Sequence, residues 1–370
     1  MRVLILSART GWHTDELCRA LTARGHQPCL APYESLVAEF GERSDRSDRS
    51  DRSDRSNRSL MFSRSDAHVS NGSNDSNDSN DSNDSNDSNV SNVSNDSNDS
   101  NDSNDSNDSN DSNDSNVLTF DAVLARIIPN GSLEQLIFRV DTLHWIEDQG
   151  IAVVNSARAI ERSVDKFYTT AILQQAGLPV PETVVCERAD DAMAAIRRML
   201  DRGGEVIIKP IFGSMGHGLI RVGDPELAWR VVRPLEQMRS VFYVQRAVDH
   251  GGRDVRLFVA GGRVVGAIER TAPAGDWRTN VARGGSARAI DPPPAWRDCA
   301  IMATAAVGAD YAGVDLLLSS SGEVFVLEVN GIPGWQGLQT ATGVDVAAAI
   351  VEQVEVRAAG LREFPEQVHA

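Results

Sequence analysis

A stretch of 74 residues, from 43 to 116, limits what this chain can fold into more than any other feature. It consists almost wholly of Ser-Asp-Arg triplets followed by Ser-Asn-Asp triplets, and Leu60, Met61 and Phe62 form its one apolar cluster. Such a composition buries too little surface to offset the conformational entropy lost on ordering. We therefore predict a disordered low-complexity insertion at 43–116, whose removal should leave function near normal. If the protein were instead a scaffold that associates through the repeat, removal of 43–116 should abolish its function.

The insertion also carries much of the acidic charge. Its 17 Asp and 7 Arg account for −10 of the formal net charge of −17, which leaves −7 for the rest of the chain. A mildly acidic remainder is ordinary for a globular enzyme and argues against nonspecific binding of nucleic acid. Cys18, Cys29, Cys186 and Cys299 are far apart and form no CxxC pair, which predicts reduced thiols.

The sequence shows neither a targeting segment nor a membrane segment. The apolar run at 3–6 is too short for a signal peptide, and no run approaches the ~20 apolar residues that a membrane span needs. We expect a cytoplasmic protein.

The N-terminal part has the alternation of strands and helices expected of a parallel α/β sheet. Strands are expected at 3–6, 26–30, 121–127 and 151–154, and helices at 14–24 and 133–149. The loop after the first strand has neither the GxGxxG fingerprint nor a P-loop lysine, although it lies at the strand edge where such sheets bind ligands. Trp12 and His13 open the next helix, and packing on the sheet is favoured over contact with a substrate.

Two apolar strands near the C-terminus, at 313–318 and 324–330, carry oxygen ligands. Side chains alternate along a strand, so Glu328 and Asn330 point the same way, and a hairpin between the strands brings Asp315 alongside. Two carboxylates and an amide oxygen, without sulfur or imidazole, suit Mg²⁺ held together with substrate phosphates. The alternative is that the two acids are edge-strand charges. Metal binding is favoured, because an unpaired buried carboxylate is costly.

A glycine-rich turn follows a strand that ends in Lys209. Gly213, Gly216 and Gly218 let backbone N–H groups approach an anion, and the lysine adds a positive charge. The pattern predicts a phosphate-binding loop, with an ordinary flexible hairpin as the alternative. Lys166, at the start of a helix, is a second cationic candidate, although taken alone it fits a solvated surface charge equally well.

An arginine-rich region lies further along the chain. Arg270, Arg278 and Asn280 follow one another within ten residues. Guanidinium groups bind carboxylates and phosphates with two parallel hydrogen bonds, and they stabilise charge that develops during transfer. The region therefore suggests an anionic ligand. An ion-pair network of these arginines with Asp254 and Glu269 is the alternative.

The order of the motifs along the chain resembles that of the ATP-grasp superfamily, and within it that of the RimK-type α-L-glutamate ligases. The motifs are an Asp-Lys helix, a lysine with its glycine loop, Asp-Val-Arg, Gly-Asp-Trp-Arg-Thr-Asn, Ala-Gly-Val-Asp and Glu-Val-Asn, over 163–355. The resemblance implies a pre-ATP-grasp α/β domain followed by a two-lobed α+β ATP-grasp fold. The implied bounds are 1–42 and 117–162 for the first domain, 163–358 for the second with lobes at about 163–245 and 246–358, and 359–370 for a tail.

The activity that the resemblance implies is an ADP-forming ligation of a carboxylate to an amine. ATP phosphorylates an acceptor carboxylate, and the amino group of L-glutamate attacks the acyl phosphate. By match of motif, ATP would be bound by Lys166, Lys209, Gly213, Ser214, Gly216, Gly218, Gln245, Arg246, Ala247, Val248, Asp249, Asp254 and Thr279. Catalysis would fall to Arg270, Arg278 and Asn280, and substrate binding to Arg126 and Arg256. Two Mg²⁺ or Mn²⁺ ions would be held by Asp315, Glu328 and Asn330.

One departure from the family pattern concerns the segment at 241–249, a strand whose polar end would offer backbone groups to the adenine. Arg246 stands where relatives often carry an acid, and the loop from there to Asp254 is one residue shorter. Adenine recognition through the backbone is expected to survive, whereas the ribose contacts are in doubt. The simpler alternative is that the polar segment is only a turn.

The N-terminal half bears on the acceptor. Residues 125–135 and 154–156 look like the branch of the tetrahydromethanopterin glutamate ligases, which implies a small-molecule carboxylate as acceptor. Arg126 at a strand end would meet that carboxylate, with a salt bridge to Glu134 as the alternative. Competing functions are glutamylation of a ribosomal-protein C-terminus, ligation of another amine such as D-alanine or lysine, and nucleotide binding without turnover. The family also implies a homo-oligomer that binds neither nucleic acid nor membranes.

Overall fold

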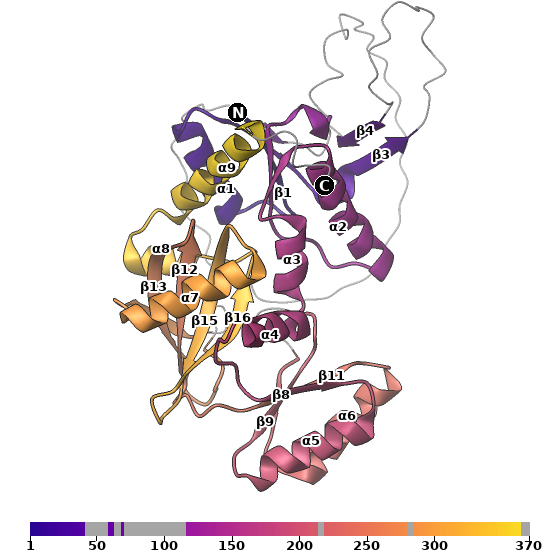
Figure 1. The fold of residues 1–370 in the computed structure, drawn as a ribbon, viewed down its shortest axis with the longest axis vertical. Helices are drawn as coiled ribbons and strands as arrows, with labels where there is room; N and C mark the ends of the chain where they lie inside the picture. Colours follow the sequence, from indigo (N-terminus) through magenta and orange to yellow (C-terminus); the bar gives the residue numbers. More distant parts are fainter. Residues whose placement is uncertain (41–57, 63–67, 70–115, 214–217, 280–283, 364–370) are drawn as a thin grey trace, which may run out of the picture.

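The computed structural model describes residues 1–40, 58–62, 68–69, 116–213, 218–279 and 284–363, and these build three layered units (Figure 1). An N-terminal α/β unit lies at the top of Figure 1, a sheet with its covering helices lies below it, and a smaller sheet with two helices lies at the bottom. The predicted combination of an α/β domain with two α+β lobes is confirmed.

The N-terminal unit contains a five-stranded sheet in the order β5-β2-β1-β6-β7. Its strands are β1 (Arg2–Leu6), β2 (Gln27–Ala31), β5 (His68–Val69), β6 (Ala122–Ala125) and β7 (Ala152–Val154). β1 pairs in parallel with β2 and β6, and β6 with β7, whereas β5 runs antiparallel to β2. The four parallel strands follow the predicted pattern to within two residues at each end.

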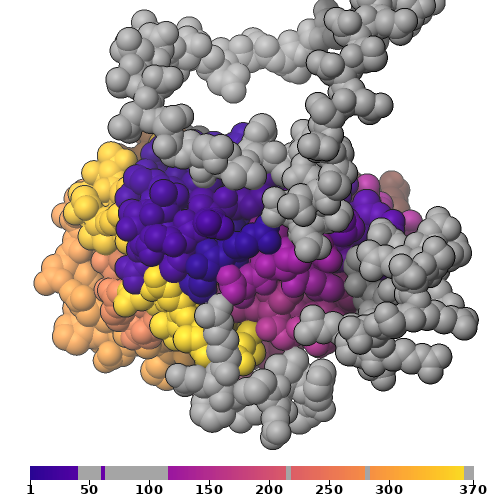
Figure 2. Space-filling model, turned by 90° about the horizontal axis from the view of Figure 1, so that it is seen from above, coloured from indigo at the N-terminus to yellow at the C-terminus, as the bar shows by residue number. Residues whose placement is uncertain are grey.

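Helices cover both faces of this sheet. On one face, α1 (Trp12–Ala23) packs beside α9 (Val346–Glu363), and their apolar residues share a core with β1. On the other face lie α2 (Leu133–Asp148) and α3 (Ala157–Val164). The view from above shows the indigo N-terminal residues beside the yellow C-terminal ones (Figure 2), and Arg24 and His26 both contact Glu355 of α9. The C-terminal helix therefore completes the N-terminal core.

Part of the segment predicted to be disordered belongs to the second core. The strand β4 (Arg58–Phe62) pairs antiparallel with β3 (Leu36–Phe40). Its residues Leu60 and Phe62 are buried in the core that α2 and β6 also contribute to. The prediction for 43–116 is wrong at these positions, because two apolar residues on one face of a strand are enough to close a hairpin over exposed core. The remaining repeats lie outside the described residues, apart from β5 and Asn116.

This hairpin changes what a deletion should do. Leu60 is fully buried, so Leu60→Ala is expected to lower the free energy of unfolding by about 2–4 kcal/mol. Removal of 43–116 should destabilise the protein, whereas replacing only 70–115 by a short Gly/Ser linker should leave stability and activity near those of the parent. Urea unfolding of the three variants checks both statements, and equal stability of the two deletions would contradict them.

The smaller unit is an antiparallel sheet of four strands in the order β10-β9-β11-β8. The strands are β8 (Thr183–Cys186), β9 (Val206–Lys209), β10 (Ile220–Val222) and β11 (Phe242–Arg246), and the helices are α5 (Ala189–Asp201) and α6 (Pro225–Gln237). Val206, Ile208, Phe242 and Val244 pack on these helices. Because side chains alternate along a strand, the intervening residues face the opposite side.

The third unit is an antiparallel sheet in the order β14-β13-β12-β15-β16. The strands are β12 (Arg253–Ala260), β13 (Arg263–Thr271), β14 (Ser286–Ala289), β15 (Tyr311–Leu318) and β16 (Val324–Asn330), with helices α4 (Lys166–Gln175), α7 (Pro294–Val307) and α8 (Gln336–Thr342). One face packs on α4 and α7. The predicted hairpin between the two acid-bearing strands is confirmed. None of the helices among the described residues is long and apolar enough to cross a membrane.

A β-bulge in β16 sets the direction of the acidic side chains. Asp315 pairs with Glu328, but the next residue, Leu316, pairs with Val326, so Leu327 is the extra residue. Val326 and Val329 are thus both buried on the α7 face although they are three residues apart. Glu328 and Asn330 point to the other face together with Asp315.

Candidate active site

The face of the small sheet opposite α5 and α6 carries a row of polar groups. Thr183, Lys209, Tyr243 and Gln245 occupy the strand positions that alternate with the residues buried under α5 and α6. The register pairs Tyr243 with Lys209 and Gln245 with Thr183, so the four lie in adjacent rows. This face is where the sequence predicted binding of ATP phosphates.

Lys209 is held by a neutral partner. Its Nζ donates to Gln245 Oε1 at 2.6 Å, and Gln245 Nε2 donates to Thr183 Oγ1 at 2.9 Å and to Tyr243 Oη at 3.2 Å. The ammonium lies 5.8 Å from the centre of the Tyr243 ring. Burial lowers the pKa of Lys209 to about 8, against the opposing charge of Glu328, and the charge of Lys166 lowers it further.

Lys166 begins α4 and reaches the glycine loop. Its Nζ donates to the Gly213 carbonyl at 2.6 Å and to the Ile211 carbonyl at 3.3 Å. Burial lowers the pKa of Lys166, and the charges of Glu328 and Asp165 oppose that shift. Glu328 on the large sheet is therefore close enough to both lysines to act on their charge. The three residues come from the start of α4, the small sheet and the large sheet, and the shared role expected of them stays a prediction.

The lowered pKa of Lys209 implies a stability cost at neutral pH. Because the native state binds fewer protons than the unfolded state between pH 8 and 10.5, the stability of the native state rises with pH across that window. Lys209→Met should therefore stabilise the fold at pH 7, and by progressively less above pH 8. Part of the side chain still contacts solvent, so the expected gain is about 1–2 kcal/mol rather than the ~3 kcal/mol of a full shift. Urea unfolding at pH 7 and pH 10 measures it, and a larger gain at pH 10 would contradict the sign.

The polar face of the large sheet holds a chain of alternating charges. Arg270 makes two hydrogen bonds to Asp254, at 2.7 and 2.6 Å, and its Nη2 lies 2.9 Å from Asp315 Oδ2. Arg256 makes two hydrogen bonds to Asp315, at 2.6 and 2.7 Å, and Thr279 Oγ1 donates to Asp254 at 2.6 Å. Arg270 thus lies in an ion-pair network, as in the alternative for the arginine-rich region. That alternative misplaced Glu269, which pairs with Arg288 on the other face.

Asp315 keeps capacity for a further ligand. Its burial would raise the pKa, but the charges and hydrogen bonds of Arg256 and Arg270 lower that pKa to about 2. A carboxylate has about four lone-pair sites. Three of them accept from the arginines, which leaves one site on Oδ1. The oxygen atoms of Asp315, half-buried Glu328 and Asn330 therefore fit a hard cation, although the arginines already balance much of the Asp315 charge. Among the described residues, no group of three His, Cys, Asp or Glu side chains could hold a metal.

The strand β11 ends in the segment predicted to contact adenine. The backbone N–H groups of Arg246 and Ala247 donate to the carbonyls of Glu182 and Glu205, both at 2.8 Å. A base at this hinge would therefore use other backbone groups among residues 246–249, including those of Val248. Asp249 Oδ1 accepts from Gly251 N–H at 3.4 Å, which supports the turn that was the alternative for this segment.

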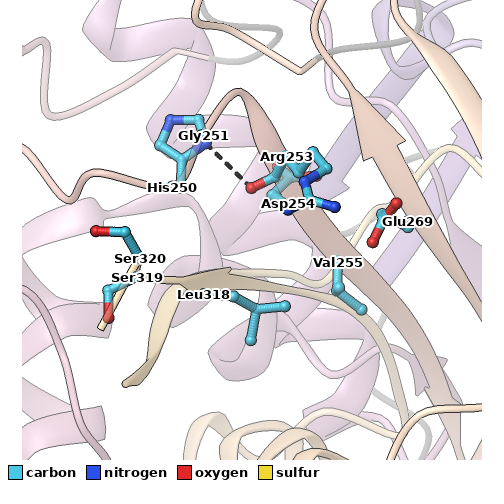
Figure 3. A pocket seen from close by; sticks show the side chains of 9 residues that line it. All are labelled: His250, Gly251, Arg253, Asp254, Val255, Glu269, Leu318, Ser319 and Ser320. Carbon is cyan, nitrogen blue, oxygen red and sulfur yellow. Dashed lines mark hydrogen bonds between the residues drawn. The ribbon is translucent and has the colours of Figure 1, made fainter. Parts of the chain in front are cut away.

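A cavity of about 200 Å³ opens beside that turn (Figure 3). It lies at the end of the large sheet, where the loop after β11 meets the turn between β15 and β16, and His250 Nδ1 donates to the Arg253 carbonyl at 3.0 Å. Val255 and Glu269 lie on the α7 face of this sheet. Lys166, Lys209 and Glu328 are not among the residues that line the cavity. Its lining consists of His250, Gly251, Arg253, Asp254, Val255, Glu269, Leu318, Ser319 and Ser320.

Several residues predicted for the site pair with a neighbour in the sequence or lie outside the described residues. Arg278 pairs with its neighbour Asp276, and its hydrogen bonds lower the pKa of that carboxyl to about 2. Ser214, Gly216 and Asn280 lie outside the part of the chain that the structure describes. Gly213 and Gly218 flank the undescribed loop residues and have φ of 137° and 73°, a region that favours glycine.

Arg126 lies at the contact between the N-terminal unit and the large lobe. It is 2% exposed, its Nη2 donates to the Pro333 carbonyl at 3.1 Å, and its guanidinium lies 4.6 Å from the centre of the Trp335 ring. The backbone N–H of Trp335 donates to His13 Nε2 at 3.1 Å, and burial followed by the charge of Arg126 lowers the pKa of His13 to about 4. Trp12 packs against the core that contains β1, as predicted, whereas His13 lies against Trp335, with ring distances from Trp12 and His13 to Trp335 of 6.2 and 4.6 Å.

Sequence reasoning missed three members of the lysine network. Thr183, Tyr243 and Thr170 were not singled out, although Tyr243 shares a strand face with Gln245 and that alternation is legible in the sequence. Thr170 Oγ1 lies 2.7 Å from Tyr243 Oη, a contact between α4 and the small sheet. No local pattern predicts a contact between elements so far apart.

Comparisons with known proteins agree with this arrangement. The family model described as the RimK-like ATP-grasp domain matches residues 163–354. A protein of Methanosarcina acetivorans named tetrahydromethanopterin:alpha-L-glutamate ligase is 33% identical over 262 residues, which cover 64% of this chain and 80% of that protein. A probable alpha-L-glutamate ligase of Trichodesmium erythraeum is 35% identical over 237 residues, with 64% and 77% covered.

Solved structures show the same fold. The ATP-grasp ligase PsnB, complexed with a minimal precursor, superposes with a TM-score of 0.63 at 19% identity and covers 96% of this chain and 98% of its own. A RimK domain ATP-grasp protein of Sphaerobacter thermophilus gives 0.61 at 21% identity, with 95% and 99% covered. The family model spans more than half of the chain and the relatives are matched over most of their length, so the chain belongs to the RimK-like ATP-grasp family and is an ATP-dependent ligase that forms carbon–nitrogen bonds.

Proposed function

We propose that the protein joins L-glutamate to the carboxylate of a small-molecule acceptor through an acyl phosphate. The observation that carries this proposal is that Lys166 Nζ is bonded to the Gly213 carbonyl of the glycine loop and Lys209 Nζ to Gln245, with both lysines within electrostatic range of Glu328. Two cations and an oxygen ligand at one place suit a triphosphate with its metal. Phosphoryl transfer needs positioning and charge neutralisation more than covalent participation of the protein.

The small sheet, the start of α4 and the large sheet contribute different contacts to ATP in this proposal. Lys209 and Lys166 bind phosphate oxygens of ATP, and Lys166 exchanges the carbonyls of Ile211 and Gly213 for the phosphates. Backbone groups at 246–249 contact the adenine, while Gly213, Gly218 and the loop between them cover the phosphates. Asp254 and Thr279, already joined to each other, contact ATP from the large sheet.

The metal ligands lie on the neighbouring strands. Asp315, Glu328 and Asn330 would hold two Mg²⁺ or Mn²⁺ ions, which neutralise charge that develops on the transferred phosphoryl group. Arg270 holds Asp315 and Asp254 in place, and Arg256 orients Asp315 from its other side. Arg278 and Asn280 stabilise the acyl phosphate, with the Asp276 pair released when Arg278 engages it.

The acceptor is proposed to be a tetrahydromethanopterin-like cofactor. One relative, at 33% identity, is named for that acceptor, whereas the relative from Trichodesmium erythraeum is named only as a probable alpha-L-glutamate ligase. Arg126 lies where the N-terminal unit meets the large lobe, and its cationic side chain supports a role in binding the acceptor carboxylate.

The test is ADP formation from Mg²⁺-ATP with purified full-length protein. L-Glutamate is held constant while reduced pterins with a free carboxylate and peptides with acidic C-termini are varied, and the reverse set replaces L-glutamate by other amino acids with the acceptor held constant. We expect ADP only with the pterin and L-glutamate together, and a product heavier by one or more glutamyl residues. Turnover with the acidic peptides but not with the pterins would contradict the proposed acceptor. Turnover with another amino acid but not with L-glutamate would contradict the proposed amine.

A further inference from the structure

We infer that Gln245, Tyr243 and Thr170 form a directed hydrogen-bond chain that positions Lys209 and joins it to the helix turn that carries Lys166. The chain runs from β9 through β11 to α4. Its members touch one another and the lysines, so they are positioning residues. The inference rests on the proposed phosphate-binding role of the two lysines.

The first step fixes the orientation of Gln245. A lysine ammonium can only donate, so the atom that accepts from Lys209 Nζ at 2.6 Å must be the amide oxygen. The amide nitrogen then faces Thr183 Oγ1 and Tyr243 Oη, and both must accept. Thr183 can do so because its own proton goes to the Pro181 carbonyl at 2.8 Å.

The second step fixes the direction of the remaining bonds. Thr170 Oγ1 donates its single proton to the carbonyl of Lys166, four residues earlier in α4, at 2.8 Å. In the contact of 2.7 Å between Thr170 Oγ1 and Tyr243 Oη, Tyr243 must therefore be the donor. Burial raises the pKa of Tyr243, so its phenol keeps the proton that this bond needs. Each N–H or O–H proton of Gln245, Tyr243 and Thr170 therefore has one acceptor.

The chain has a specific electrostatic property. Gln245 is 3% exposed and takes the hydrogen bond of Lys209 without adding a negative charge. A glutamate at this position would hold the lysine equally well but would neutralise it beside an incoming triphosphate. The neutral amide orients the ammonium and leaves its charge for the phosphates. The link to the Lys166 carbonyl keeps the small sheet and α4 in one register, so both lysines approach the same ligand.

The test compares variants that break the chain with a matched helix threonine. Thr170→Val and Tyr243→Phe each remove a hydroxyl that makes two hydrogen bonds in the chain, without changing shape much, whereas Thr170→Ser keeps the hydroxyl. Thr304 in α7 makes the same bond to the carbonyl four residues earlier, to Ala300 at 2.9 Å, so Thr304→Val is the control. Binding of Mg²⁺-ATP without acceptor is measured by calorimetry, and KM for L-glutamate is measured at saturating ATP.

We expect Thr170→Val and Tyr243→Phe to weaken ATP binding about 5- to 20-fold, with KM for L-glutamate unchanged. Thr170→Ser should restore parental affinity, Thr304→Val should have no effect on it, and the double variant should lose no more than the larger single loss. Parental affinity in the two single variants, or fully additive losses in the double variant, would overturn the chain.

Lys209→Met in the same assay separates this inference from the proposed function. If Lys209→Met binds ATP like the parent, the phosphate role of the lysine is wrong, and the chain loses its purpose with it. If Lys209→Met loses ATP binding while Tyr243→Phe and Thr170→Val keep it, the lysine role holds and only the chain is refuted.

Discussion

Glu328→Gln is expected to abolish measurable ATP turnover, a fall of ~10³-fold or more, while leaving the fold intact. Glu328 stands opposite Asp315 on the polar face of the large sheet and acts on the charge of both lysines. The amide keeps the size of the side chain but removes the negative charge on which the proposed metal ligation depends. The measurement is ADP release at saturating Mg²⁺-ATP, glutamate and acceptor.

A matched control keeps this result interpretable. Glu323 lies on the turn of the same hairpin, is exposed, and accepts a hydrogen bond from Ser321. Glu323→Gln removes one charge from the same element and should leave turnover within about twofold of the parent, because exposed charges far from a site act weakly. Retained turnover in Glu328→Gln would refute its role at the metal site.

Arg270→Met should lower the free energy of unfolding by about 3–5 kcal/mol. Arg270 is 4% exposed and is bound to Asp254 and Asp315, which are themselves 3% and 4% exposed. Without it, Asp254 keeps only the hydroxyl of Thr279 among the hydrogen bonds of its side chain in the described structure, and Asp315 keeps only Arg256. Buried carboxylates that lose a bonded cation bear a large desolvation cost.

Arg263→Met on the same strand is the control for Arg270→Met. Arg263 pairs with Glu352, and both side chains are about half exposed. An exposed ion pair contributes about 0–1 kcal/mol, so the control should unfold at nearly the parental urea concentration. If Arg270→Met and Arg263→Met had the same free energy of unfolding, the buried ion-pair network would stabilise the fold no more than an exposed ion pair does.

Much of the architecture follows from local patterns in the sequence. The apolar runs at β1, β6, β9 and β15 predict their own burial, and the period of two along β11 separates the core side from the polar side. The short hairpin predicts that the two acid-bearing strands pair, but the register set by the turn alone would place Asp315 opposite Leu327. The bulge in β16 places Glu328 there instead.

Other features were out of reach because they depend on contacts between distant segments. Leu60 and Phe62 sit in a segment whose composition predicts disorder, and only the open core beside β3 makes them a strand. Likewise, the sequence of α9 shows an apolar helix but not that it packs against α1, more than 300 residues earlier.

The sequence by itself determined which residue types are available for a site, among them Asp315, Glu328 and the two lysines, and the order of the elements that carry them. The tertiary structure decided their partners. It placed Arg270 and Arg256 on Asp315, turned Gln245 towards Lys209, and buried Arg126 against Trp335. The physical reason is that a residue type fixes what a side chain can donate, accept or neutralise, whereas packing fixes which groups come within 3 Å of it.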